Sequence, residues 1–90
     1  MTKAENFLAT MAAIDANLKG IERMKSIRQL ITAINIECIE LKHKADGSII
    51  YRFDDSSHLR VDGIKIEKAT AKEYGKPYKR IQGTLKGKQQ

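Results

Sequence analysis

The side chains with the clearest capacity for chemistry are cations, and they gather near the C-terminal end of the sequence. Residues 72–90 hold six lysines and arginines with one glutamate, whereas residues 1–71 hold eleven cations and ten carboxylates. The last part of the chain therefore carries +5 of the net charge of +6. A cationic segment beside a nearly neutral body is typical of electrostatic attachment to an anionic partner.

Aromatic rings are interleaved with these cations over residues 72–80. Lysine and arginine release counterions from a nucleic-acid backbone, and tyrosine rings stack on exposed bases. We expect this segment to contact nucleic acid or an acidic partner through Lys72, Tyr74, Lys76, Tyr78, Lys79 and Arg80. Two alternatives stay open, namely a basic tail that serves solubility and tyrosines that fill the core.

A second group of polar residues has the types needed for metal binding or acid–base chemistry, namely Asp54, Asp55, His58 and Asp62. Their spacing fits neither a calcium loop nor a zinc site, and residues 54–57 are better explained as a turn whose side chains cap their own backbone. No serine, cysteine or lysine stands in a nucleophile motif, and the glycines are not grouped into a phosphate-binding loop. We therefore expect no catalytic residue, no metal and no cofactor.

The composition predicts one small domain. The 90 residues are 41% hydrophobic and contain no tryptophan, so the core is aliphatic and modest, and a homodimer would add burial. Cys38 is the single cysteine and lies among apolar residues, which predicts an inert thiol. The sequence shows no signal peptide and no apolar stretch of ~20 residues, so we expect a cytoplasmic protein without membrane contact.

Apolar residues in the first third recur at helical spacing. One series predicts a helix over residues 3–18, where Thr2 and Glu5 match a capping box. A second series predicts a helix over residues 21–34, joined to the first by a tight corner at Gly20. One long helix kinked at Gly20 is the alternative. The two series are Phe7, Met11, Ile14, Leu18 and Ile21, then Ile21, Met24, Ile27, Ile31 and Ile34.

The apolar period then changes to two, which predicts strands. Turns are expected at residues 45–47, at residues 55–57 and at the dipeptide Asp62-Gly63, and they give a four-stranded antiparallel meander. We expect an α+β domain over residues 1–82, with the helices over one apolar sheet face. A helical turn over 69–74, an edge strand over 78–82 and a flexible basic tail over 83–90 complete the prediction. The expected inward residues are Ile39, Leu41, Tyr51, Phe53, Leu59, Val61, Ile64 and Ile66.

The same strand register predicts the opposite sheet face. One row would hold Glu40, Arg52, Arg60 and Lys65, and the next would hold Cys38, Asp54, His58 and Glu67. Three adjacent cations repel one another when they are unpaired, so Arg52, Arg60 and Lys65 are candidate partner-binding residues. A solvated face that serves solubility is the alternative.

One hairpin resembles a known type of protein. The pattern Tyr-x-Phe-Asp-Asp-x-Ser-x-Leu, followed by glycine, resembles a hairpin of small bacteriophage proteins that include an anti-CRISPR inhibitor of a multi-subunit RNA-guided complex. That inhibitor is strongly acidic and this chain is basic, so the resemblance implies neither mimicry of DNA charge nor any functional residue. It implies a phage or mobile-element setting. The residues are Tyr51, Phe53, Asp54, Asp55, Ser57, Leu59 and Gly63.

Three functions are therefore consistent with the sequence. The first is a non-enzymatic inhibitor that binds a host protein or ribonucleoprotein complex through a basic surface, in the host cytoplasm. The second is an accessory protein that binds DNA or RNA directly. The third is a structural subunit that associates with itself.

Overall fold

The protein has the expected α+β fold, described over residues 1–76 in a computed structural model. Two long helices, α1 (Lys3–Asn17) and α2 (Gly20–Glu37), precede an antiparallel sheet in the order β1-β2-β3-β4. The predicted edge strand over residues 78–82 and tail over residues 83–90 lie outside this part of the chain. The remaining elements are β1 (Glu40–His43), β2 (Ile49–Arg52), β3 (His58–Asp62), β4 (Lys65–Ala69) and the short helix α3 (Ala71–Tyr74).

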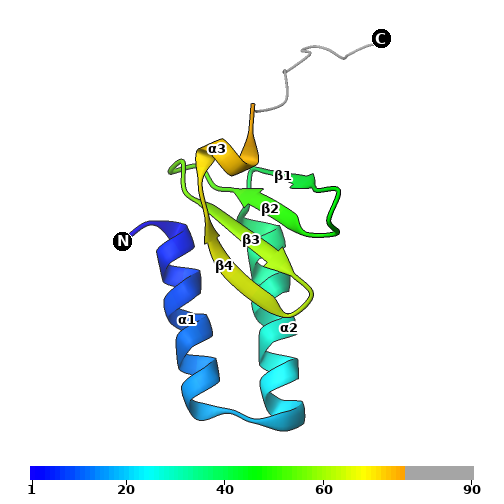
Figure 1. Ribbon diagram of the computed structural model, residues 1–90. Helices are drawn as coiled ribbons and strands as arrows, with labels where there is room; N and C mark the ends of the chain where they lie inside the picture. The colour runs from blue at the N-terminus through cyan, green and yellow to red at the C-terminus, as the bar shows by residue number, and fades with distance from the viewer. Residues whose placement is uncertain (77–90) are drawn as a thin grey trace.

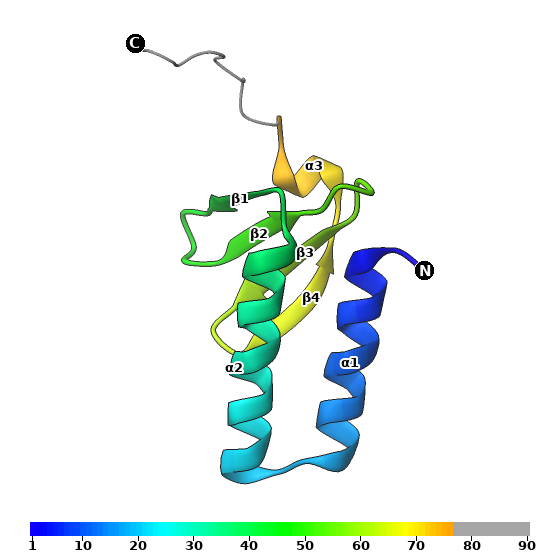
Figure 2. The same cartoon turned by 180° about the vertical axis from the view of Figure 1, so that it is seen from behind.

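The two long helices cover one face of the sheet and extend beyond it. Figure 1 shows the sheet beside the upper part of α1 and α2, with the turn between the helices far from the strands. In Figure 2, the view from behind, α2 passes in front of the strands. Helix α3 lies at the end of the sheet that is remote from the α1–α2 turn (Figure 1).

The helix boundaries follow from local chemistry. Thr2 and Glu5 form the predicted capping box, in which the Thr2 hydroxyl accepts from the Glu5 N–H and the Glu5 carboxylate accepts from the Thr2 N–H. Helix α1 ends at Asn17, and Gly20 turns the chain with a φ of +61°. Two helices are therefore confirmed, and the single kinked helix is wrong. Helix α2 continues to Glu37, three residues past its predicted end.

The core lies between the two helices and the inward sheet face. The side chains of Ile27, Ile34, Phe53 and Leu59 have no exposed surface, and the rings of Phe7 and Phe53 stack with centroids 5.6 Å apart. Each aliphatic side chain buried in this way contributes about 1.5–3 kcal/mol relative to exposure. The other buried members of the cluster are Ala4, Met11, Leu30, Tyr51, Val61 and Ile66.

The first hairpin has the predicted register, with Leu41 opposite Tyr51. Its three-residue loop ends at Gly47, whose φ is +91°, and Asp46 accepts hydrogen bonds from the N–H and the hydroxyl of Ser48. This geometry is the expected three-residue loop with a left-handed last residue. The loop therefore sets the pairing of β1 with β2 as the sequence predicts.

The second hairpin corrects the predicted register by two residues. Its loop spans residues 54–56 rather than 55–57, so Tyr51 pairs with Leu59 and not with Val61. The loop repeats the chemistry of the first one, because Asp55 accepts from the N–H and the hydroxyl of Ser57. Ser56 takes the left-handed position, with a φ of +68°. A shift of two residues leaves every side chain on its predicted face.

The third hairpin is also shifted by two residues. Asp62 pairs with Lys65 and Val61 pairs with Ile66, so the turn residues are Gly63 and Ile64 rather than Asp62 and Gly63. Gly63 has a φ of +63°, as the first central residue of a type II′ turn requires. Ile64 was expected to face the core, but its place in the turn leaves it 38% exposed.

Two further apolar predictions are corrected by the packing. Ile39, expected in the core, is 52% exposed because it stands at the outer edge of the sheet, just before β1. Ile21 is exposed because it lies in the first turn of α2, beyond the area that the sheet covers. The spacing of apolar residues in the sequence does not show which of them lie beyond the elements that could cover them.

The second hairpin loop also holds the start of α1. The Asp55 carboxylate accepts from the Lys3 N–H at 2.7 Å, and the Ser57 hydroxyl accepts from the Ala4 N–H at 3.2 Å. The Lys3 ammonium forms ion pairs with Asp54 at 3.0 Å and with Glu37 at 3.4 Å. The loop thus satisfies backbone donors that every helix leaves open at its first turn.

Asp55 is expected to make the free energy of unfolding depend on pH in the acidic range. Hydrogen bonds from Ser57 and Lys3 lower the pKa of Asp55 from 3.8 to about 2. Because the unfolded chain takes up this proton first, we expect the free energy of unfolding to fall as the pH drops from about 4 towards 2. Denaturant unfolding of Asp55→Asn should lack this part of the decline. Asp62→Asn, in the exposed turn, is the control and should keep it; an unchanged profile in Asp55→Asn would contradict the assignment.

Ser56 stores backbone strain that glycine would relieve. A non-glycine residue in the left-handed region costs about 1–2 kcal/mol, and the exposed Ser56 side chain leaves room for its removal. We expect Ser56→Gly to raise the free energy of unfolding by up to about 1 kcal/mol, since the added freedom of the unfolded glycine offsets part of the gain. Urea denaturation measures this change. Ser56→Ala keeps the Cβ and should show no gain, and a loss of stability with glycine would refute the argument.

Candidate binding surface

Arg52 and Arg60 lie on the sheet face turned away from α1 and α2, but they do not share a row. Arg52 is paired with Glu40 on one side and His58 on the other, whereas Arg60 is paired with Ile50 and Glu67. The predicted row of Glu40, Arg52, Arg60 and Lys65 is therefore wrong, because both later turns are shifted by two residues. Arg52 and Arg60 therefore stand in separate rows, each of which also holds a carboxylate, Glu40 in one and Glu67 in the other.

Each predicted partner-binding cation has a carboxylate of its own. Arg52 lies 3.6 Å from Glu40, and Lys65 lies 3.8 Å from Glu67. Arg60 is held between two carboxylates, Asp46 of the first loop and Glu73 of α3, the latter at 3.7 Å. These pairs neutralise the face locally, so Arg52, Arg60 and Lys65 do not form a bare cationic patch. Their role towards a partner stays a prediction.

Helix α3 covers part of this face. Its start is a second capping box, in which Thr70 and Glu73 satisfy each other's backbone N–H groups. Tyr74 is 1% exposed and packs against Ile50 and Ala69, with its ring centroid 5.3 Å from that of His58. The predicted helical turn is confirmed, except that Ala69 belongs to β4.

Tyr74 is a core residue in this structure. Its hydroxyl donates to the Glu40 carboxylate at 2.6 Å, and its ring is covered by Lys42, whose Nζ lies 4.6 Å from the centroid. Of the two predicted roles for the Tyr74 side chain, the buried one matches the geometry, and stacking on a base would require α3 to leave the sheet. Tyr78, Lys79 and Arg80 lie outside residues 1–76.

Four lysines lie at the α3 end of the molecule. Lys42 Nζ donates to the Lys76 carbonyl, and Lys44 Nζ lies 3.4 Å from the Tyr74 carbonyl oxygen. The ammonium groups of Lys42 and Lys44 thus lie beside carbonyl groups at the C-terminal end of α3, where the partial negative charge of a helix end favours cations. Lys72 and Lys76 are exposed on α3 and just after it. We call this surface the basic end: Lys42, Lys44, Lys72 and Lys76.

The carboxylates nearest to the basic end are engaged elsewhere. Glu40 accepts from Tyr74 and pairs with Arg52, and Glu73 caps the α3 N-terminus and pairs with Arg60. The basic end is also where the chain continues into residues 77–90, which carry four more lysines and arginines and no carboxylate side chain.

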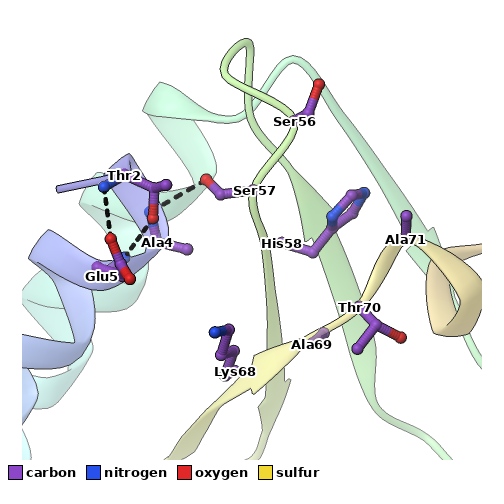
Figure 3. A pocket seen from close by; sticks show the side chains of 10 residues that line it. All are labelled: Thr2, Ala4, Glu5, Ser56, Ser57, His58, Lys68, Ala69, Thr70 and Ala71. Carbon is purple, nitrogen blue, oxygen red and sulfur yellow. Dashed lines mark hydrogen bonds between the residues drawn. The ribbon is translucent and has the colours of Figure 1, made fainter.

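A hollow beside the start of α1 is a second place where a ligand could be considered. It lies between the α1 start and the ends of β3 and β4, and Figure 3 shows Thr2, Glu5 and Ser57 hydrogen-bonded around it. The His58 ring points away from these groups, towards Ala71 (Figure 3). The α1 amides that would attract an anion are already bound by Asp55 and Ser57. Lys68 is an exposed cation at the wall of this hollow, whereas the first α1 amides are not open to a ligand.

The candidate metal ligands are separated. Asp54 and Asp55 hold the α1 start, as capping turn residues do, whereas His58 contacts Tyr74. No group of three or more histidine, cysteine, aspartate or glutamate side chains within residues 1–76 is arranged to hold a metal ion. Cys38 is half-buried, donates to the Asn35 carbonyl at 3.3 Å, and has a pKa raised by burial.

Comparison of the chain with protein-family models, with curated proteins and with solved structures finds no match. Among the described residues, none of the helices has the length and apolar character needed to cross a membrane. The proposal for function therefore rests on the geometry of the surface.

We expect His58, whose ring packs against Tyr74 of α3, to make the free energy of unfolding depend on pH. Burial against α3 and, to a smaller extent, the Arg52 charge lower the pKa of His58 below 6.5. The unfolded chain then binds a proton before the folded chain does, so the free energy of unfolding should fall as the pH drops from about 7 to 5. His58→Phe, which stays neutral, should lose this part of the pH dependence in denaturant titrations. His43→Gln changes the exposed histidine and should retain it; identical profiles for both variants would contradict the prediction.

Proposed function

We propose that the chain is a small non-enzymatic binding protein that attaches to an anionic host assembly through the basic end. The supporting observation is the convergence of Lys42, Lys44, Lys72 and Lys76 at the point where the cationic C-terminal segment begins. The two lysines of β1 and its loop come from a segment some thirty residues upstream, so folding adds charge that the sequence run alone lacks. Electrostatic attraction of this kind raises the rate of association with the partner, and the affinity that it supplies falls with added salt.

The proposed partner is a ribonucleoprotein or an acidic protein, and the proposed activity is inhibition by occupation. The hairpin resemblance suggests a phage or mobile-element protein, for which an RNA-guided defence complex in the host cytoplasm is a suitable target. In this proposal the ion-paired Arg52 and Arg60 hold α3 and the first loop in place, and the basic end makes the first contact. Lys65, which pairs with Glu67 of its own strand, would join the contact with the partner. Lys79 and Arg80 extend that contact along the chain.

Direct binding of DNA or RNA is the second candidate function. The same lysines favour it, because phosphate contacts need only an exposed ammonium group. The burial of Tyr74 counts against it, since the ring would be one of the two predicted stacking platforms. Nucleic-acid binding through this end would therefore depend on charge and show little base preference.

A charge-reversal pair tests the proposal. Lys72→Glu/Lys76→Glu reverses two exposed charges of the basic end, and Lys19→Glu/Lys25→Glu makes the same change in net charge near the α1–α2 turn. We expect the first variant to bind a purified multi-subunit RNA-guided complex at least about tenfold more weakly than the native chain, a loss of about 1.4 kcal/mol, with the control nearly unchanged. Binding is measured by surface plasmon resonance at two salt concentrations.

Free single-stranded RNA and DNA oligomers form the second arm of the experiment. Binding to the complex without comparable binding to the oligomers supports the inhibitor. Equal, steeply salt-dependent binding to the oligomers supports the second candidate function instead. Equal losses in both charge variants would remove the basic end as the site, and no binding to any of the three probes would refute both functions.

A further inference from the structure

Strand β1 forms a sheet edge that the described part of the chain leaves open. The strand order puts β1 and β4 at the two edges, and α1 packs against β4. Strand β1 pairs with β2 on its inner side, and Figures 1 and 2 both show its outer side without a neighbouring helix or strand. An open edge is a surface on which another strand can add.

The loop chemistry defines which backbone groups this edge presents. The Lys44 N–H donates to the Ser48 carbonyl at 2.8 Å, and Lys42 pairs with Ile50 in the same register. Successive residues of an antiparallel strand direct their N–H and C=O groups to opposite sides. Lys42 and Lys44 therefore bond β2, while Leu41 and His43 direct their backbone groups to the open side.

We propose that this edge pairs with the same edge of a second copy of the chain, antiparallel and with the two-fold axis at Leu41. Leu41 then faces Leu41 of the second copy. His43 lies beside Ile39 of the second copy, whose own N–H donates to the Arg52 carbonyl within its sheet and is not available at the seam. Glu40 faces Lys42 of the second copy, and symmetry repeats this contact on the other side of the axis. The strand is thus complementary to itself in charge, as an interface between identical subunits requires. The contact between copies would add to those that these side chains make within one copy, where Glu40 accepts from Tyr74 and Lys42 donates to the Lys76 carbonyl.

Each neighbouring register sets a pair of like charges face to face. Within β1 the outward backbone groups belong to Leu41 and His43, so the pairing can shift only in steps that keep odd residues opposite odd residues. Moving the axis to residue 40 places Glu40 against Glu40 of the second copy, and moving it to residue 42 places Lys42 against Lys42. Both alternatives set like charges face to face at the axis. An axis at residue 42 would also set Glu40 opposite Lys44 of the second copy, but the axis at Leu41 brings opposite charges together without a like-charge contact at the axis.

Exposed apolar side chains flank the same edge. Ile36, in the last turn of α2, is 76% exposed, and Ile39, next to β1, is 52% exposed. Ile39 lies on the same side of the strand as Leu41, so strand addition covers part of its surface. The paired sheets would be continuous and would carry both basic ends on their common outer face. This association does not depend on the proposed function.

Light scattering after size exclusion, over a range of concentrations, tests the pairing in the full chain. We expect the mass to rise from 10.2 kDa towards twice that value, because a four-residue edge gives a weak, concentration-dependent dimer. His43→Pro removes an outward N–H and leaves the β1–β2 ladder intact. Ile39→Lys adds charge at the seam. Each should raise the dimer dissociation constant at least about tenfold, and Ile64→Lys, in the remote β3–β4 turn, should not.

Hydrogen exchange of the native chain gives a readout that needs no variant. In concentrated samples the Leu41 and His43 amides should exchange more slowly than in dilute samples, while the Lys42 amide is unchanged. Circular dichroism verifies that each variant is folded. A monomer at millimolar concentration, a dimer that both edge variants leave intact, or concentration-independent exchange at Leu41 and His43 would each overturn the proposal.

Discussion

The contact between the Asp55 carboxylate and the start of α1 is the constraint on which the rest of the structure depends. One carboxylate accepts from Lys3 of the helix and from Ser57 of its own loop, so a single side chain closes the hairpin and fastens the N-terminal helix to it. The Lys3 N–H and the Ser57 donors therefore have hydrogen-bond partners, and the free-energy cost of leaving such donors without a partner is avoided. The loop thereby sets the register of β2 and β3 and the position of α1 together.

The two faces of the sheet differ in which side chains they carry. The inward face meets α1 and α2 and is filled by aliphatic and aromatic side chains. The outward face carries a second, smaller apolar cluster of Ile50, Ala69 and Tyr74 under α3. Ion pairs surround this cluster, with Arg60 joined to both the first loop and α3. The result is a short C-terminal helix held by a few polar contacts and one buried aromatic ring.

The candidate surface could be predicted only in part. Charge counting locates the cationic segment, because formal charge is a property of sequence alone. It misses the contribution of Lys42 and Lys44, whose approach to Lys76 and Tyr74 depends on α3 folding back over β1 and β2. It also overestimates the patch at Arg52, Arg60 and Lys65. The shift of two residues places Arg52 and Arg60 in different rows, and Arg60 pairs with carboxylates that the first loop and α3 bring to it. The repeated Asp-x-Ser of the two loops was the available signal for that register.

The sequence by itself determined the helix start at Thr2, the break at Gly20, the alternation of the strands and hence which side chains face the core. These features depend on local hydrogen bonding, on glycine at positive φ and on a period of two that a shift of two residues preserves. Only the tertiary structure decided that Ile39 and Ile64 are exposed and that Tyr74 is buried. It also decided which carboxylate neutralises each arginine. Exposure and ion pairing depend on where packed elements end and on which loops meet, and these relations join residues far apart in the chain.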